Sequence, residues 1–141
     1  MAFPLPEPRP CGGCTACCTA LYVEELAKQA GLPCSCLRGD GCGIWEERPR
    51  ICRGFFCNWA LGDPSLPEEA RPDRSGLLAW AECGAAGLIL QVRELRPGAL
   101  QAEEARRLVE RARAVVPVAL EAADGRRRFG MPGQDWIEIP V

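Results

Sequence analysis

GLLAWAECGAAGLILQVREL, residues 76–95, contains two runs of apolar residues separated by glycines. The runs GLLAWAE (76–82) and GLILQVREL (87–95) are typical of β-strands, and the glycines between them favour a turn. Residues 99–116 then repeat apolar side chains at helical spacing, with Glu and Arg opposite. This order predicts two strands and a helix, and we expect the apolar stripe of the helix to comprise Leu108, Val109, Ala112, Val115 and Val116.

Residues 118–131, VALEAADGRRRFGM, have the pattern of a β-hairpin. Asp124 and Gly125 would supply a two-residue turn that tolerates positive φ. The C-terminal part of the chain, residues 77–141, is therefore predicted to be a β-β-α-β-β unit, and the fold class is predicted to be α+β.

The ten cysteines of the 141-residue chain are distributed unevenly, since nine lie between Cys11 and Cys57 and only Cys83 lies outside. This distribution predicts an N-terminal cysteine-cluster module over residues 1–62. The stretch 61–76 contains three prolines and two glycines, so we predict a connector over residues 63–76.

Within the module, residues 17–33 are expected to form a short amphipathic helix with Leu21, Tyr22 and Leu26 on one side. Residues 34–57 are interrupted repeatedly by glycine and proline and are predicted to be mostly loop. A loop of this kind cannot be held by a hydrophobic core alone, so another interaction must hold it together.

Composition limits the classes of function. The formal net charge is −2 and both signs are spread along the chain, which argues against binding to nucleic acid or to an anionic membrane. The leading residues MAFPLPEPRP contain four prolines and no apolar run, so we expect neither an export signal nor a membrane anchor, and a cytoplasmic protein. The chain has no histidine, which excludes Ser-His, Cys-His and His-metal hydrolytic sites.

Clustered cysteines in a reducing cytosol are more often metal ligands than disulfides. If the chain is helical from about Cys14, then Cys14, Cys17 and Cys18 share one face of one turn. Three thiolates so close would repel one another unless a cation lay among them. The alternatives are disulfides, buried free thiols (which suits Cys83), and a C-x-x-C redox motif, which lacks its usual strand–helix context here.

Three segments carry a resemblance to a known family. CGGCTACC (11–18), PCSCL (33–37) and GCGIWEERPRICRGFFC (41–57) resemble the cysteine-cluster family with the signature C-x-x-C-x-x-C-C followed by C-x-I-[YW]-E-x-R-P-x-x-C-R-x-F-x-C. That family is described as zinc- or iron-chelating, or as containing an iron–sulfur cluster, and flagellin lysine methylases have a similar cysteine motif. The resemblance covers residues 11–57, about a third of the chain.

The resemblance implies eight metal ligands. Cys36 stands where relatives often carry a histidine or an aromatic residue, so its role as a ninth ligand stays open. All-thiolate sets select zinc, copper(I) or iron–sulfur clusters, and the family description favours iron–sulfur slightly over zinc. The adjacent cysteines at 17 and 18 indicate more than one metal ion. The implied ligands are Cys11, Cys14, Cys17, Cys18, Cys34, Cys42, Cys52 and Cys57.

The residues between the cysteines fit a metal site in two ways. Arg48, Arg50 and Arg53 could offset the negative charge of a thiolate centre or could be surface charges paired with Glu46 and Glu47, and for Arg50 the surface role is favoured. Four aromatic residues could form a jacket that excludes water, or simply the core of a small module: Trp45, Phe55, Phe56 and Trp59.

The expected function is metal binding by a cluster that is structural or electron-transferring and serves an unidentified protein partner. The alternatives are a metal-dependent enzyme or enzyme subunit in protein modification, as the lysine methylases suggest, and metal storage or delivery. Paired acids such as Glu46 and Glu47 are typical of an exposed surface, and the sequence contains no phosphate-binding loop. An enzymatic function is therefore the less favoured hypothesis.

Overall fold

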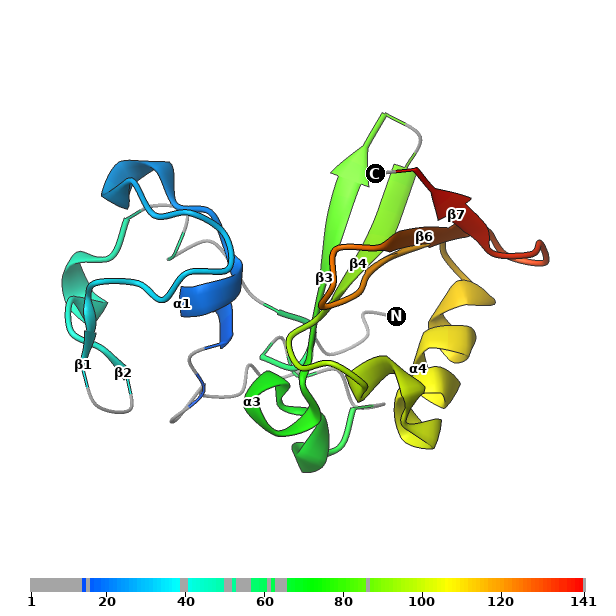
Figure 1. Cartoon of the computed structure of the whole chain (residues 1–141), viewed down its shortest axis with the longest axis horizontal. Helices are drawn as coiled ribbons and strands as arrows, with labels where there is room; N and C mark the ends of the chain where they lie inside the picture. Colours follow the sequence, from blue (N-terminus) through cyan, green and yellow to red (C-terminus); the bar gives the residue numbers. More distant parts are fainter. Residues whose placement is uncertain are drawn as a thin grey trace, which may run out of the picture.

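A computed structural model describes residues 14, 16–38, 41–49, 52, 57–60, 62, 66–85 and 87–140. Its main feature is a five-stranded sheet in the order β3-β4-β5-β6-β7 (Figure 1). Neighbouring strands are antiparallel except β4 and β5, which run parallel. The fold class is α+β, as predicted. The strands are β3 (Leu77–Gly84), β4 (Gly87–Glu94), β5 (Val118–Glu121), β6 (Arg127–Gly130) and β7 (Ile137–Ile139).

The first two predicted strands are confirmed as the β3–β4 hairpin. Its register runs from Leu77 opposite Glu94 to Gly84 opposite Gly87. Gly87 has a φ of 112°, which glycine adopts readily and other residues do not. The glycine there is therefore required by the turn.

Helix α4 (Glu103–Arg113) connects the parallel strands β4 and β5, after the short 3-10 turn η4 (Ala99–Gln101). Parallel neighbours need a crossover of this kind because a tight turn joins only antiparallel strands. The helix buries Ala105 and Val109, in agreement with the predicted stripe at Val109. Val115, however, is 77% exposed, because the helix ends at Arg113, and this part of the prediction is wrong.

The β5–β6 hairpin is confirmed, but its turn differs from the prediction. The backbone N–H of Ala122 bonds to the carbonyl of Arg126, and the N–H of Gly125 bonds to the carbonyl of Ala122. Three residues therefore form the loop, and only Gly125 among them has a positive φ. This is the arrangement of a type I turn followed by a left-handed glycine, rather than a two-residue turn. Strand β7 was not predicted, because three residues are too few to show a periodic pattern.

The two faces of the sheet pack against different parts of the chain. On one face, Val92, Val118 and Leu120 form a core with Leu100 and Val109 from the helical crossover. Because side chains alternate along a strand, Leu78 points to the opposite face. There it packs with four residues from the first half of the chain: Ala20, Cys57, Trp59 and Ala60.

The predicted helix over residues 17–33 is wrong. Helix α1 ends at Ala20, and Val23 and Lys28 form an isolated antiparallel bridge. Tyr22, expected on the apolar side, is half exposed. The physical reason is competition for the carbonyls: Thr19 and Leu21 accept hydrogen bonds from the Lys28 ammonium, and a helix would need those carbonyls for its own backbone.

Among the described residues of the rest of the cysteine-rich part, the elements are short, as its glycines and prolines predict. Figure 1 shows α1, β1 and β2 grouped to one side of the five-stranded sheet. The elements are α1 (Ala16–Ala20), η1 (Glu24–Leu26), β1 (Leu37–Arg38), β2 (Gly41–Cys42) and η2 (Trp45–Glu47).

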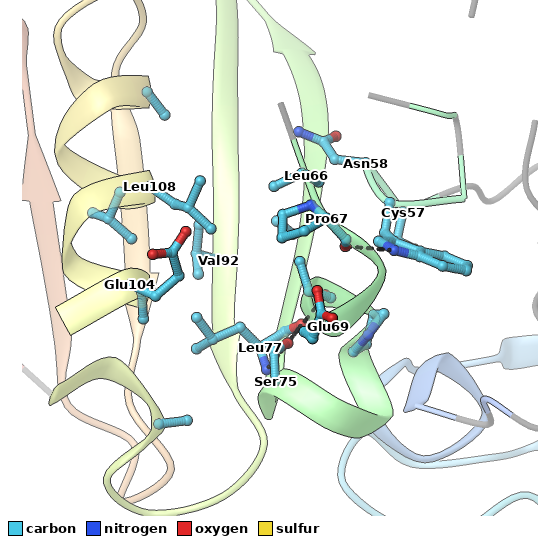
Figure 2. Close-up of a pocket in the computed structure, with 18 of the residues that line it drawn as sticks. Cys57, Asn58, Leu66, Pro67, Glu69, Ser75, Leu77, Val92, Glu104 and Leu108 are labelled. Carbon is cyan, nitrogen blue, oxygen red and sulfur yellow. Dashed lines mark hydrogen bonds between the residues drawn. The ribbon is translucent and has the colours of Figure 1, made fainter. Parts of the chain in front are cut away.

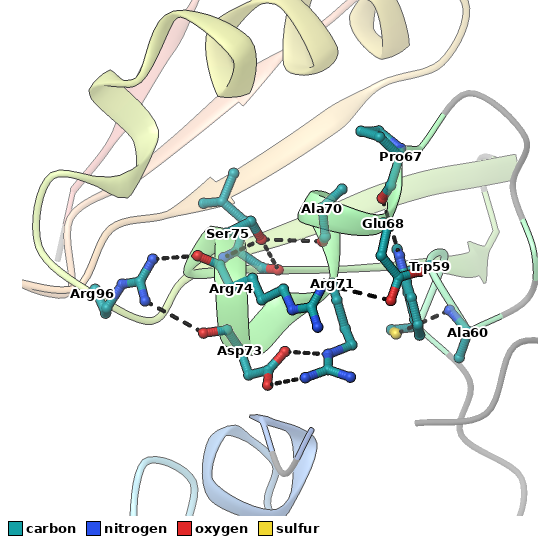
Figure 3. Close-up of polar contacts among 12 residues, drawn as sticks. Trp59, Ala60, Pro67, Glu68, Ala70, Arg71, Asp73, Arg74, Ser75 and Arg96 are labelled. Carbon is teal, nitrogen blue, oxygen red and sulfur yellow. Dashed lines mark hydrogen bonds and ion pairs between the residues drawn. The ribbon is translucent and has the colours of Figure 1, made fainter. Parts of the chain in front are cut away.

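The predicted connector contains ordered structure of its own in residues 66–76, and residues 63–65 lie outside the described part. It forms η3 (Glu68–Ala70) and α3 (Pro72–Ser75), and Pro72 is buried. Figure 3 shows Arg96 donating hydrogen bonds to the carbonyls of Asp73 and Arg74, which fixes α3 to the loop after β4. The segment therefore packs as part of the fold.

No helix within the described ranges is both long enough and apolar enough to cross a bilayer.

Candidate metal centre

Nine of the ten cysteines lie among the described residues, and all nine are free thiols. Cys11 lies outside the described residues, as do Arg50, Arg53, Phe55 and Phe56. Cys57 is buried and Cys83 is exposed on β3. The other seven are half-buried: Cys14, Cys17, Cys18, Cys34, Cys36, Cys42 and Cys52.

The backbone brings Cys18 and Cys34 together. Helix α1 carries Cys17 and Cys18, and the N–H of Cys34 donates to the carbonyl of Cys18 at 3.0 Å. The N–H of Cys36 then points to the sulfur of Cys34 at 3.4 Å. A backbone N–H aimed at sulfur stabilises a thiolate, whether free or bound to a metal.

The hairpin of β1 and β2 brings Cys42 back to the same region. Cys42 pairs with Leu37, and the N–H of Gly43 donates to the carbonyl of Cys36 at 2.7 Å. A Cβ at Gly43 would lie 2.8 Å from that carbonyl oxygen and 2.6 Å from Cγ of Arg38. The tight return of the chain toward Cys36 therefore requires glycine at this position.

Four thiols interact electrostatically, and we call Cys18, Cys34, Cys42 and Cys52 the thiol set. Burial raises the pKa of Cys52, and negative charge on each of the other three raises it further. Cys17 lies beside the set, since it is hydrogen-bonded to Cys18. The pKa of Cys18 is lowered to about 7 by this hydrogen bond and, to a smaller extent, by the positive charges of Lys28 and Arg48. Desolvation and the neighbouring Cys34 raise the pKa of Cys36.

A second interaction links Cys14 with Cys57. Helix α1 begins at Ala16, so Cys14 is outside it and does not share a helical face with the next two cysteines. Burial raises the pKa of Cys14, and negative charge on Cys57 and Asp73 acts in the same direction. The N–H of Ala60 points to the sulfur of Cys57 at 3.4 Å. Among the described residues, the interactions of the expected ligands therefore fall into two groups, the thiol set and the pair of Cys14 and Cys57.

Asp73 beside Cys14 is held by an arginine. Arg71 donates to both carboxylate oxygens of Asp73, at 2.6 and 2.7 Å (Figure 3). This hydrogen bonding, more than any other effect, lowers the pKa of Asp73. The carboxylate is thus kept ionised and oriented next to the second pair of cysteines.

Lys28 is a site residue that reasoning from the sequence missed. It is 6% exposed, and its ammonium donates to the carbonyls of Thr19 and Gln29 at 2.9 and 3.0 Å and also to that of Leu21. The signal that could have identified it is its rarity, because it is the only lysine among 17 basic residues.

Of the four aromatic residues that could form a jacket around the metal, Trp59 is the one whose environment is described, and it belongs to the core. Trp59 is 5% exposed and its indole N–H donates to the carbonyl of Pro67 at 3.2 Å. It packs with Ala20 and Leu78, which favours the core reading of this tryptophan over a metal jacket.

A cavity of about 390 Å³ lies beside Cys57 (Figure 2). Its wall is mostly apolar and comes from β3, β4, α4 and residues 57–59 and 66–75, with Leu77, Val92 and Leu108 among the lining residues. Glu69 and Glu104 add carboxylates to the lining.

Within the described residues, no three or more cysteine or carboxylate side chains are grouped so as to hold a metal ion. The chain matches no known family model, and it matches no curated protein and no solved structure.

Proposed function

We propose that the cysteine-rich part of this chain binds metal through its thiolates, as an iron–sulfur cluster or, as the alternative, zinc. The centre would be structural or electron-transferring and would serve a partner protein. The observation that carries the proposal is the thiol set, in which negative charge on Cys18, Cys34 and Cys42 raises the pKa of Cys52. Sulfur-only donors fit soft or borderline metals, including zinc and iron–sulfur clusters.

The scarcity of buried residues around the thiols supports the same conclusion. Between residues 14 and 52, wherever burial is described, only Ala20, Val23 and Lys28 are buried. Such a segment gains little from hydrophobic burial, so its stability needs another source. Metal–thiolate bonds supply that source in small cysteine-rich modules, where binding free energy becomes folding free energy.

The division of the cysteines supports more than one metal ion. In the proposal the thiol set binds one centre, with Cys17 and Cys36 beside it. Cys14 and Cys57 contribute to a second, for which Cys11 is the expected further thiolate. When metal binds, the chain's own residues hold the sulfurs by short loops, by the N–H of Cys36 and by the N–H of Ala60.

Burial favours a lasting centre over metal storage or delivery. Delivery needs ligands that a receiving protein can reach, whereas the eight described cysteines outside β3 are half-buried or buried. A metal-dependent enzyme is the second candidate, favoured by the cavity that Cys57 lines. Ala105→Leu, which fills that cavity, should abolish the enzymatic activity of the metal-loaded protein and leave its metal content unchanged. Activity equal to that of the wild type would rule out an active site in the cavity.

The test is to purify the full chain without oxygen and to measure iron, acid-labile sulfide and zinc together with the visible absorbance spectrum. Brown protein containing iron and sulfide supports the cluster. Colourless protein with about one or two zinc ions per chain supports zinc, because each four-thiolate site binds one ion. Protein that contains none of these, with its thiols freely reactive, overturns the proposal.

A further inference from the structure

The ammonium of Lys28 is buried and fully bonded. Its three hydrogen-bond partners are the carbonyls of Thr19, Leu21 and Gln29. An ammonium has three N–H donors and no acceptor, so these three carbonyls use its whole capacity. The side chain is therefore fixed in place.

The backbone fixes this position next to the thiol set. Val23 and Lys28 exchange two backbone hydrogen bonds, of 3.0 and 2.9 Å, so that the chain turns back toward α1. The N–H of Cys34 reaches the carbonyl of Cys18 at 3.0 Å. Thr19, whose carbonyl binds the ammonium at 2.9 Å, directly follows Cys18. The positive charge thus lies beside the stretch of backbone that joins Cys18 to Cys34.

A buried cation needs negative charge nearby. Removing an ammonium from water costs several kcal/mol, and neutral carbonyls recover only part of this cost. Burial accordingly lowers the pKa of Lys28, and negative charge on Cys34, Cys18, Cys17 and Cys52 acts in the opposite direction. The thiolates are therefore the anions that face this ammonium.

A negatively charged metal–thiolate centre in turn needs positive charge nearby. A divalent zinc ion or a 2+ cluster held by four thiolates keeps a net charge of about −2. We propose that Lys28 is the fixed counter-ion of the metal–thiolate centre, with its ammonium bonded to the carbonyls of Thr19, Leu21 and Gln29 so that it offsets the charge of the centre. The inference rests on the proposed function and adds a positioning residue to it.

The choice of lysine fits this role. All other basic residues of the chain are arginines. A guanidinium presents a flat fork of five donors, whereas an ammonium is compact and directs three donors to converging carbonyls. The seat formed by Thr19, Leu21 and Gln29 has the second geometry.

A pair of variants tests the inference. Lys28→Met removes the charge and keeps a long side chain, and Arg38→Met removes one positive charge from an exposed position in the same module. Full-length proteins are loaded with metal without oxygen, and metal loss to a competing chelator is measured. We expect Lys28→Met to lose metal about 10- to 100-fold more readily, as for other residues that support ligands. Arg38→Met should stay within about twofold of the wild type, because exposed charges contribute little.

The outcomes separate the inference from the proposed function. If Lys28→Met retains metal as tightly as Arg38→Met does, the counter-ion role is overturned and the proposed function stands. If the wild-type chain holds no metal, the proposed function fails and the inference fails with it.

A second measurement needs no variant, so it applies even if Lys28→Met does not fold. An amine-acylating reagent can modify only Lys28 and the N-terminal amine, because the chain has one lysine. Mass spectrometry of the full chain follows both sites before and after metal removal. We expect Lys28 to be protected in the loaded protein and modified after removal, when the charge of the metal–thiolate centre no longer holds the ammonium. Equal protection in both states, or modification of the loaded protein at the rate of the N-terminal amine, overturns the inference.

Discussion

Cys52 and Cys83 are chemically identical thiols in different surroundings. Cys52 is half-buried, and burial together with Cys18, Cys34 and Cys42 raises its pKa. Cys83 is exposed on β3, opposite Leu88. The two positions therefore form a matched pair for testing the metal assignment.

Cys52→Ser should lose the metal bound by the thiol set, about half of the total if each of two centres binds one ion. The reason is that a serine hydroxyl stays protonated at neutral pH and is a poor ligand for a soft metal. Cys83→Ser should keep its metal. Elemental analysis of the purified variants gives the ratio of metal to protein, and equal loss in both variants would contradict the assignment.

Single residues also show what sequence reasoning can and cannot reach. The spacing of cysteines identifies a metal-binding pattern because ligand type and short loops are local properties. Lys28 was missed because its role depends on carbonyls seven and nine residues away, which meet only after the chain has turned. The separation of Cys14 from Cys17 depends likewise on where α1 begins.

At the level of elements, Trp136 is among the residues that join α4 to the segment before β7. The indole N–H of Trp136 donates to Glu110 at 3.0 Å, and Arg113 lies over the ring, 5.0 Å from its centre. Arg113 also pairs with Glu110 at 2.6 Å. Because Trp136 directly precedes β7, these contacts hold the edge strand against the helix.

This cluster should make stability depend on pH. The Arg113 guanidinium, and next the Trp136 indole, lower the pKa of Glu110 below its ordinary value of 4.5. A carboxyl with a lowered pKa adds stability above its ordinary pKa, and this stability is lost as the pH falls through the lowered pKa. We expect Glu110→Gln to cost about 0.5 kcal/mol at pH 7, typical of an exposed pair. Urea unfolding between pH 3 and 7 measures the difference in free energy of unfolding between variant and wild type. This difference should vanish at the acid end of the range, and a difference independent of pH would contradict the prediction.

Elements with a strong periodic pattern were predictable, and short ones were not. The strands β3 and β4 and helix α4 are long enough for burial to set a period of two or of 3.6 residues. Residues 17–33 also have helical spacing, but the carbonyls of Thr19 and Leu21 bind Lys28 instead of continuing the helix. A tertiary contact thus overrode a local preference.

At the level of the whole molecule, Arg93 links the cysteine-rich part to the sheet. Its guanidinium donates to the carbonyl of Ala20 at the end of α1, at 2.6 Å. The same group pairs with Glu121 at 3.1 Å and lies 5.6 Å from the centre of the Trp80 ring. Ala20 also packs with Leu78 in the core that both parts share.

Arg93→Met should therefore weaken the coupling between the two parts. We expect a loss of about 1.5–3 kcal/mol, the range for a hydrogen bond to a charged donor. Thermal unfolding of the metal-loaded protein should change from one transition to two, because the sheet no longer stabilises α1. Arg107→Met, which removes only exposed ion pairs with Glu103 and Glu104, is the control and should unfold in one transition. A single transition in both variants would show that the shared core alone couples the parts.

X-ray absorption at the metal edge of the loaded, full-length protein tests the central claim most directly, because it identifies the atoms bound to the metal. For zinc the account predicts about four sulfur atoms at about 2.3 Å, and for a cluster it predicts cysteine and sulfide sulfur around each iron. A first shell made mainly of oxygen or nitrogen at about 2.0–2.2 Å would contradict it.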